Sequence, residues 1–280
     1  MPITNAYVIN LDTHQERLEG FNESFSELNV TRFSGVDSSS LTEEQEELKR
    51  RYISPNSKLS NAEVGCFLSH LSLWKILVDS DQERMTIFED DSRTLLKVED
   101  INEYVDSVTE EYSILYLGKA LADCVAMKKV EVEGRGRDRV YEADYVLCFH
   151  AYVITRETAE KLLSSEATAS PIDLWVVNKR QELNLRFLVF HPSLVYQDVL
   201  NTTSSLRNDT SAIYNTLDCR PPGLDMKADV KAIATQAVNG VGGWGNIFAI
   251  IMAALVIIVI LIFGGMLFYS MQFHRTEYQV

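Results

Sequence analysis

The sequence predicts an α/β domain with a mainly parallel central sheet, followed by one C-terminal membrane-spanning helix. Two observations predict the domain. Short apolar segments alternate with helical patterns up to about residue 206, and polar side chains directly follow several of the apolar segments. A third observation predicts the helix, because Ile247 to Tyr269 is a run of 23 residues without a charged side chain.

The average composition conceals this division. The 280 residues include 26 basic and 40 acidic side chains, which gives a net charge of −14, yet residues 232–274 contain no Asp, Glu, Lys or Arg. The acidic excess therefore belongs to the N-terminal part. It argues against nucleic acid as a partner, because a phosphate backbone is bound through Lys and Arg, whereas a divalent cation is compatible with it. The four cysteines lack zinc-finger spacing and are predicted to be reduced and mostly buried.

In the first half of the domain, the apolar runs predict strands at 6–11, 30–33 and 85–88. Between the first two strands lies a helical pattern with four apolar side chains on one face, Leu18, Phe21, Phe25 and Leu28. Ser60 and Glu63 have the spacing of a capping box, so a long helix is expected from there to about residue 79.

In the second half, strands are expected at 113–117, 130–133, 146–154 and 185–190. Helices are expected between them at 98–108, 157–164 and 171–183. The glycine-bearing segment 134–139 is predicted to be a solvated hairpin turn. It is not a phosphate-binding loop, because no helix start follows its glycines at the required spacing.

Boundaries follow from these patterns: a domain over 1–206, a linker over 207–246 with a short amphipathic helical pattern, the span over 247–269 and a tail over 270–280. The N-terminus shows no signal-peptide pattern, so the span is expected to act as a single-pass C-terminal anchor with the domain on the cytosolic side of the membrane. The alternative is a lumenal domain, which glycans at Asn201 or Asn208 would mark.

The segment that most strongly indicates a functional site is Glu89-Asp90-Asp91, which follows the strand at 85–88. Three adjacent carboxylates repel one another at a sheet end, so a positive group is expected there. Hard cations such as Mg²⁺ or Mn²⁺ prefer oxygen ligands, and the side chains of Glu89 and Asp91 point the same way from an extended backbone. The alternative is an acidic loop that merely ends the strand.

The acids belong to one of six ordered motifs: YVINLD at 7–12 with Arg17, EVGCFLSHLSLWK at 63–75, FEDD at 88–91, LYLG at 115–118, HAYVITRETAEKL at 150–162 and PIDLW at 171–175. Together they resemble glycosyltransferase family 25, which includes the lipooligosaccharide galactosyltransferases of bacteria and the collagen galactosyltransferases. The resemblance covers about residues 3–198 and does not extend to the C-terminal segments.

The resemblance implies a GT-A-like, Rossmann-like nucleotide-sugar fold, a UDP-sugar donor and a Mn²⁺ or Mg²⁺ ion on the donor diphosphate. The expected reaction is an inverting transfer of a hexose, galactose or glucose, to a hydroxyl of a glycan or protein near a membrane. By position, Asp91 is implied as the principal metal ligand, and Asp90 or Glu89 is implied to hold the metal or the donor ribose. A metal on the leaving diphosphate neutralises developing charge without a proton.

Further donor-binding candidates lie before the acids. Asn10 and Asp12 end the first strand, where a nucleotide is expected, although Asp12 could instead cap the next helix. Arg17 could approach a phosphate, or could form an ion pair on a solvated helix face. Ser69 and His70 are candidates for the donor pocket on the strength of the resemblance, and the alternative is that they are packed, hydrogen-bonded core residues.

The remaining candidates lie after the acids. His150 could add an imidazole to the metal ligands Asp91 and Glu89, with His191 as the second choice, or could be a buried structural residue. Asp173 is the preferred catalytic base for the acceptor hydroxyl, and its alternative is a helix-terminal acid that interacts with the helix dipole. Asp144 and Asp198 are the next acids for that role.

A different class of function is also compatible with the sequence. The domain could be a catalytically inactive, glycosyltransferase-like structural or interaction module anchored in a membrane, for example that of a viral particle. The intact acidic triplet argues against this alternative, and binding of UDP with Mn²⁺ would separate the two.

Overall fold

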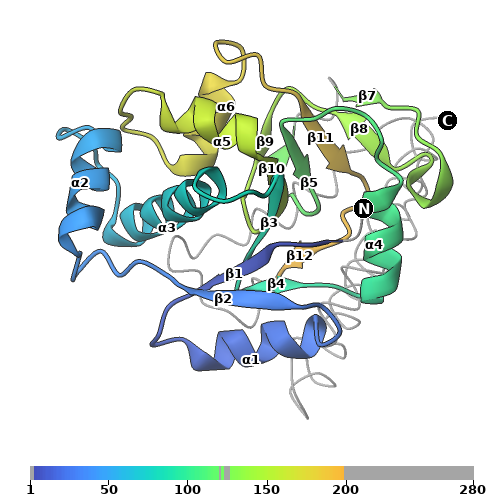
Figure 1. The fold of residues 1–280 in the computed structure, drawn as a ribbon, viewed down its shortest axis with the longest axis horizontal. Coiled ribbons are helices and arrows are strands. Elements are labelled where there is room, and N and C mark those ends of the chain that lie inside the picture. Colours follow the sequence, from blue (N-terminus) through green and yellow to red (C-terminus); the bar gives the residue numbers. More distant parts are fainter. Residues whose placement is uncertain (1–2, 120, 123–126, 199–280) are drawn as a thin grey trace, which may run out of the picture. The chain divides into compact units, whose positions relative to one another are not determined.

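The structure is a computed structural model that describes residues 3–119, 121–122 and 127–198 (Figure 1). The chain divides into two units, 1–232 and 233–280, and every described residue belongs to the first. The predicted linker, membrane span and tail, from residue 207 onward, lie outside the described residues. Within the described part of the chain, no helix is both long and apolar enough to cross a bilayer.

A mixed sheet of eight strands forms the centre of the domain, in the order β2-β1-β3-β10-β5-β11-β8-β7. The strands in chain order are β1 (Ala6–Asn10), β2 (Val30–Ser34), β3 (Arg84–Glu89), β5 (Ile114–Tyr116), β7 (Lys128–Lys129), β8 (Val140–Glu142), β10 (Ala151–Thr155) and β11 (Phe187–Phe190). β1 is parallel to β2 and β3, and β11 is parallel to β5, as the alternating pattern predicts.

The sheet departs from the predicted arrangement at β10 and β8, which run antiparallel to their neighbours. A parallel neighbour needs a crossover, usually a helix, and no α-helix lies between β5 and β10 in the described residues. β10 therefore pairs with both β3 and β5 in the opposite direction.

Helices cover both faces of the sheet. α1 (Gln15–Ser24) and α4 (Val98–Asp106) pack on one face, where their aromatic and aliphatic side chains bury Phe88 and Leu115. The other face carries the remaining α-helices, α2 (Glu43–Tyr52), α3 (Asn61–Val78), α5 (Arg156–Leu163) and α6 (Ile172–Lys179). Figure 1 shows α1 and α3 on opposite sides of β1 and β2. The result is a three-layer α/β/α domain, in agreement with the predicted fold class.

Two small sheets lie beside the main one. β4 (Ser92–Arg93) pairs with β12 (Tyr196–Gln197), and β6 (Leu121–Ala122) pairs with β9 (Val146–Leu147). The strand predicted at 146–154 is therefore wrong as a single element. It is interrupted at Cys148, whose φ of 73° lies in the left-handed region that breaks an extended run.

The region around residues 130–142 and helix α2 also differ from the prediction. Residues 130–133 form no strand, and the strand of that region is β7. β8 pairs with β11 although no pattern predicted it. α2 was also not predicted, yet Thr42 and Gln45 form a complete capping box at its start. The turn at 134–139 contains a 3₁₀-helix, η1 (Gly134–Gly136), that contacts α4, with Arg135 paired to Asp100 and Glu103.

α3 begins where the capping box predicts. The Ser60 hydroxyl accepts from the Glu63 N–H, and the Glu63 side chain accepts from the Ser60 N–H. One turn further along, α3 lies so close to the loop after β2 that a Cβ on Gly65 would meet the carbonyl oxygen of Val36 at 2.5 Å. Glycine is required here for close approach, and it brings α3 and the loop together at the edge of the sheet.

Replacement of Gly65 by alanine is expected to lower the free energy of unfolding by about 1–3 kcal/mol, because a backbone carbonyl cannot move aside as a side chain can. Gly20→Ala is the matched control, since the nearest atoms to its Cβ belong to the end of the Arg93 side chain. The control is expected to change stability by less than about 1 kcal/mol. Urea denaturation of the full chain in mild detergent, followed by tryptophan fluorescence, measures both. Equal stabilities of the two variants would contradict the assignment.

Candidate active site

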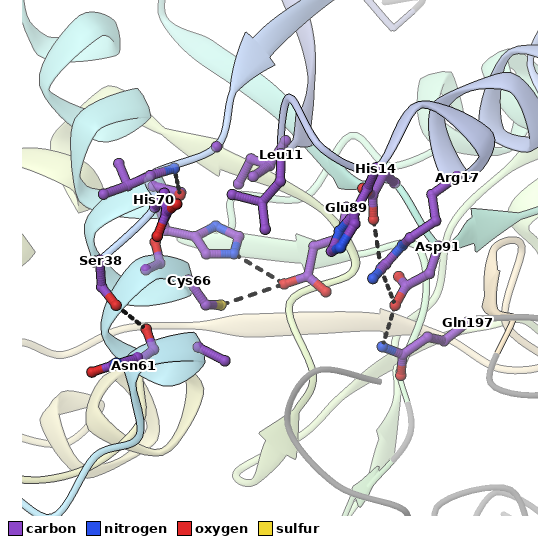
Figure 2. A pocket seen from close by; sticks show the side chains of 18 residues that line it. Leu11, His14, Arg17, Ser38, Asn61, Cys66, His70, Glu89, Asp91 and Gln197 are labelled. Atoms are coloured by element: carbon purple, nitrogen blue, oxygen red, sulfur yellow. Dashed lines mark hydrogen bonds and ion pairs between the residues drawn. The ribbon is translucent and has the colours of Figure 1, made fainter. Parts of the chain in front are cut away.

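A pocket of about 230 Å³ opens at the carboxyl ends of β1, β2 and β3. Its walls are the ends of β1 and β2, the first part of α1, the N-terminal half of α3, the acidic turn after β3 and Gln197 of β12 (Figure 2). This is the edge at which the parallel arrangement places a ligand. All three acids of the predicted triplet line the pocket.

Asp90 is buried and is fixed by two residues from the N-terminal segment. The Asn10 amide donates to its Oδ2 at 2.8 Å, and a guanidinium nitrogen of Arg17 lies 2.5 Å from its Oδ1. Burial raises the pKa of Asp90, and Arg17 and Asn10 oppose that effect. Asn10 also donates to the carbonyl of His14 and accepts from Arg32, so its amide is occupied in holding the acid turn.

Asp91 is buried too, but only one of its oxygens is occupied. Its Oδ2 accepts from Arg17 at 3.1 Å and from the Gln197 amide at 2.9 Å. Its Oδ1 is buried and has no hydrogen-bond partner among the described residues. Burial, with the neighbouring charge of Glu89, raises the pKa of Asp91 to about 7. Buried carboxylate oxygens normally accept a hydrogen bond or bind a cation, so this oxygen indicates that the pocket binds a donor or a cation there.

Glu89 faces away from the other two acids, toward α3. Its Oε1 lies 3.2 Å from His70 Nε2 and 3.7 Å from the Cys66 sulfur, and Figure 2 shows the three groups converging. Burial acts to raise the pKa of Glu89, but the hydrogen bond from His70 and the charge of Arg17 lower it, and the net shift is downward. Glu89 is therefore ionised at neutral pH.

The far side of the His70 ring is also hydrogen-bonded. His70 Nδ1 lies 2.8 Å from the hydroxyl of Tyr152, which accepts from Trp74 Nε1 at 2.9 Å. Because an ionised Glu89 can only accept, Nε2 of a neutral His70 ring carries the proton and Nδ1 accepts from Tyr152. A buried chain of hydrogen bonds thus runs from Trp74 to the carboxylate in the pocket.

The structure distinguishes between the alternatives for the N-terminal candidates. Arg17 points at Asp90 and Asp91, so the ion pair on a solvated helix face is wrong for this residue. Asp12 does not cap the helix, because α1 begins at Gln15 and has His14 at its N-cap position. The Asp12 carboxylate is exposed and pairs instead with Arg32, which together with Ser34 lowers its pKa.

Ser69 and His70 both line the pocket, as the donor-pocket prediction requires. Each is also fully hydrogen-bonded, as the structural alternative requires. The Ser69 hydroxyl accepts from the Val36 N–H and donates to the Gly65 carbonyl, so it ties α3 to the loop after β2. Ser69 and His70 are therefore both pocket-lining residues and hydrogen-bonded structural residues.

His150 is buried behind the acid turn and does not line the pocket. Its ring packs against Gly118, with Nε2 3.5 Å from the Val195 carbonyl and Nδ1 without a hydrogen-bond partner among the described residues. Burial lowers its pKa, so the ring is neutral. Its backbone carbonyl accepts from the Glu89 N–H and the Ser92 hydroxyl and so fixes the turn. His191, the second choice for a metal ligand, has its Nδ1 3.0 Å from Lys119 Nζ.

Asp173 lies at the start of α6, and its two oxygens accept from the backbone N–H groups of Cys148 and Leu174. It is not among the residues that line the pocket, although its charge reaches Cys66 and raises the pKa of that thiol together with burial and Glu89. Of the other candidate bases, Asp144 pairs with Arg180, and the Asp198 N–H donates to the Asp91 carbonyl.

Sequence reasoning missed Gln197, which supplies a hydrogen bond to Asp91 from 106 residues away. It also missed His14 and the loop 35–38, which line the pocket. Residues 35–38 could have been predicted to line the pocket, because they follow a strand of the parallel part of the sheet. No pattern in the sequence marks Gln197 as a pocket residue.

A family model described as "Glycosyltransferase family 25 (LPS biosynthesis protein)" matches residues 3–176, more than half of the chain. The chain belongs to glycosyltransferase family 25. The match contains β1, the acid turn and most of the pocket, and it confirms the resemblance that the ordered motifs indicate.

Sequence identity to individual relatives is low. "Procollagen galactosyltransferase 2" of Mus musculus is 28% identical over 182 residues, which cover 59% of this chain and 28% of that protein. "Probable inactive glycosyltransferase 25 family member 3" of Bos taurus is 32% identical over 112 residues, 39% of this chain and 18% of that protein. "Glycosyltransferase 25 family member" of Aedes aegypti is 32% identical over 102 residues, 33% of this chain and 17% of that protein. The chain thus matches less than a third of the length of these relatives.

The residues of the pocket fit the divalent cation that the family resemblance implies. Asp91 offers a buried, unpartnered carboxylate oxygen, and Glu89 offers an ionised carboxylate that lines the same pocket from the α3 side. Both are hard oxygen donors of the type that Mn²⁺ and Mg²⁺ take, usually one or two at a time beside substrate phosphates. In the structure, the guanidinium of Arg17 supplies the positive charge beside Asp90 and Asp91.

Asp91→Asn is expected to change the pH dependence of stability of the metal-free protein. The folded-state pKa of Asp91 is about 7 against 3.8 for the ordinary group, so its protonation favours the folded state. That stability is complete below about pH 4 and is lost as the pH rises through 7. The parent should therefore lose stability relative to Asp91→Asn across this range, by about 1.4 kcal/mol for each pKa unit.

Urea denaturation in EDTA at a series of pH values measures this difference. Asp81→Asn is the control, because Asp81 is an exposed acid outside the pocket. A difference between the parent and Asp91→Asn that stays constant from pH 4 to 7 would contradict the assignment.

Proposed function

We propose that this chain is a metal-dependent glycosyltransferase that moves a hexose, galactose or glucose, from a UDP-sugar to a hydroxyl of a glycan or protein. One observation carries the proposal: three consecutive carboxylates are gathered in the pocket at the sheet edge, and Asp91 keeps a buried oxygen without a partner. Family membership supports the reaction class, and the mouse relative is named for galactosyl transfer.

Asp91 and Glu89 would hold the Mn²⁺ or Mg²⁺ ion. When bound, the ion neutralises charge that develops on the leaving diphosphate. Asp90 remains held by Asn10 and Arg17, which keeps the turn in place while its neighbours bind. We assign His150 to support of this turn through its carbonyl, and its predicted role as a metal ligand is not needed for the proposal.

Arg17 has a second task in the proposed reaction. Its guanidinium bridges Asp90 and Asp91, and its Nε is buried without a partner in the described residues. A guanidinium can contact a diphosphate and a carboxylate at once through its several donors. Arg17 would therefore bind the donor diphosphate from the α1 side of the pocket, opposite the wall formed by Ser69 and His70.

An inverting transfer needs a base that removes the proton of the acceptor hydroxyl, and we propose Asp173 for it. Its carboxylate keeps lone pairs after accepting from two backbone N–H groups, and these bonds fix its orientation. Attack on the anomeric carbon forms the new glycosidic bond, breaks the bond to the diphosphate and leaves the proton on the base.

We also propose that Ile247 to Tyr269 anchors the enzyme in a membrane, with the domain on the cytosolic side. The support is the charge-free run of 23 apolar and small residues in the sequence. An anchor would concentrate the enzyme beside membrane-bound acceptors.

The full chain in mild detergent is expected to bind UDP in the presence of Mn²⁺, and Asp91→Asn is expected to weaken that binding at least about 10-fold, or 1.4 kcal/mol. Loss of one metal ligand and of its charge is the reason. Calorimetry measures the binding, and release of UDP from UDP-galactose and UDP-glucose measures turnover. Asp81→Asn is the control. Absence of any UDP binding by the parent would overturn the proposal and favour an inactive interaction module.

Asp173→Asn is expected to lower transfer to an acceptor by about 10²–10⁴-fold while UDP binding with Mn²⁺ stays unchanged, because the base acts only on the acceptor. Asp144→Asn, at an exposed acid that pairs with Arg180, is the comparison. Asparagine keeps only one acceptor oxygen, so this variant loses one of the two bonds to the N–H groups of Cys148 and Leu174. Thermal unfolding of both variants checks that the fold survives. Loss of UDP binding together with transfer in a folded Asp173→Asn variant would show that Asp173 is not the base.

A further inference from the structure

A second set of metal-binding atoms lies on the α3 side of the pocket, apart from the oxygen ligands proposed on Asp91. Cys66 and His70 are four residues apart on α3, so their side chains share one face of the helix. Glu89 reaches them from the end of β3, with its Oε1 3.7 Å from the Cys66 sulfur and 3.2 Å from His70 Nε2. The sulfur, the ring nitrogen and the carboxylate oxygen all lie within 4.8 Å of one another.

We propose that Cys66, His70 and Glu89 form a binding site for a thiophilic divalent cation, of which Zn²⁺ is the representative. Ligand chemistry selects the ion. Thiolate sulfur and imidazole nitrogen suit Zn²⁺, whereas Mn²⁺ and Mg²⁺ prefer sites made of oxygen alone. The site is therefore chemically distinct from the oxygen site that serves the donor diphosphate, although Glu89 belongs to both.

Two of the three ligand separations are close to those of a tetrahedral ion. Zinc bonds of about 2.0–2.3 Å at tetrahedral angles place neighbouring ligand atoms about 3.4–3.6 Å apart. The sulfur–oxygen and nitrogen–oxygen separations of 3.7 and 3.2 Å are close to these values before any ion is present. Three protein ligands leave the fourth position open, and Cys66 and Glu89 both line the pocket, which gives the ion a path of entry.

The surroundings of His70 are those of a metal-binding imidazole. Its Nδ1 is engaged by the Tyr152 hydroxyl, which Trp74 holds in turn, so the ring orientation is fixed from behind. The ring is completely buried and cannot turn away from the pocket without breaking this chain. Binding would move the ring proton from Nε2 to Nδ1, where it is donated to Tyr152.

Electrostatics also favours a cation at this place. Glu89, Asp91 and Asp173 all act on the Cys66 thiol as negative charges. The same negative field that disfavours a free thiolate attracts a divalent cation. Binding replaces the proton of the thiol by a sulfur–metal bond and releases that proton to solvent, so the charges balance.

The test uses Co²⁺ as a spectroscopic probe and Zn²⁺ as its competitor, with the full chain in mild detergent. The parent is expected to bind Co²⁺ with a thiolate-to-cobalt charge-transfer absorption that one equivalent of Zn²⁺ abolishes. Cys66→Ser should lose this absorption. Cys148→Ser should keep it, because Cys148 is a described cysteine outside the cluster.

Tyr152→Phe provides a second, milder variant that retains all three ligands. Loss of the hydroxyl behind His70 should weaken Zn²⁺ binding about 10–100-fold while the absorption of the Co²⁺ complex persists. Far-UV circular dichroism confirms folding of each variant. Absence of the absorption in the parent, or its persistence in Cys66→Ser, would overturn the proposal.

One consequence rests on the proposed function. Zn²⁺ bound through Glu89 removes a ligand from the Mn²⁺ site, so Zn²⁺ should inhibit transfer by the parent and should inhibit Cys66→Ser much less. The Co²⁺ spectrum reads the site directly, without turnover. A chain that binds Co²⁺ through Cys66 but transfers no sugar would therefore refute the proposed function and leave the zinc site standing.

Discussion

The structure depends on the accommodation of three adjacent carboxylates at the buried end of one strand. Neighbouring charges of the same sign in a region of low dielectric repel strongly, so each acid needs its own compensation. Glu89 turns toward His70 and α3, whereas Asp90 and Asp91 turn toward Arg17 and α1. One carboxylate thus lies on the α3 wall of the pocket and two lie on the α1 wall. The space between the walls favours a ligand that is positively charged or carries a cation.

Compensation draws on parts of the chain that are distant in sequence. Arg17 comes from α1, His70 from α3 and Gln197 from the last described strand, and all reach the same turn. The short pairing of β4 with β12 places Gln197 there, because its register sets Gln197 opposite Ser92. The mixed sheet contributes as well, since β10 runs antiparallel beside β3 and brings the carbonyl of His150 against the Glu89 N–H.

The sequence predicted those parts of the arrangement that depend on residues close together in the chain. The capping box at Ser60 and Glu63 fixed the start of α3, and the change from apolar to acidic residues at Phe88 located the sheet edge. The partner of each acid could not be predicted in the same way. Whether Arg17 pairs within its helix or with Asp91, 74 residues away, depends on tertiary packing. The two-residue strands β4 and β12 are too short to show a period at all.

Glu89 is the ligand that the two proposed cation sites share. Turned toward Asp91, its carboxylate would serve the proposed hard ion on a diphosphate. Turned toward Cys66 and His70, the same carboxylate would complete a ligand set that a softer ion prefers. Its hydrogen bond to His70 holds it on the α3 wall in the absence of a ligand, with Arg17 already neutralising the opposite wall. The proposed Mn²⁺ would therefore have to draw Glu89 away from α3, whereas Zn²⁺ would bind it where it lies. In the proposed sites, the hydrogen-bond chain behind His70 would thus hold Glu89 in the position that suits the softer ion.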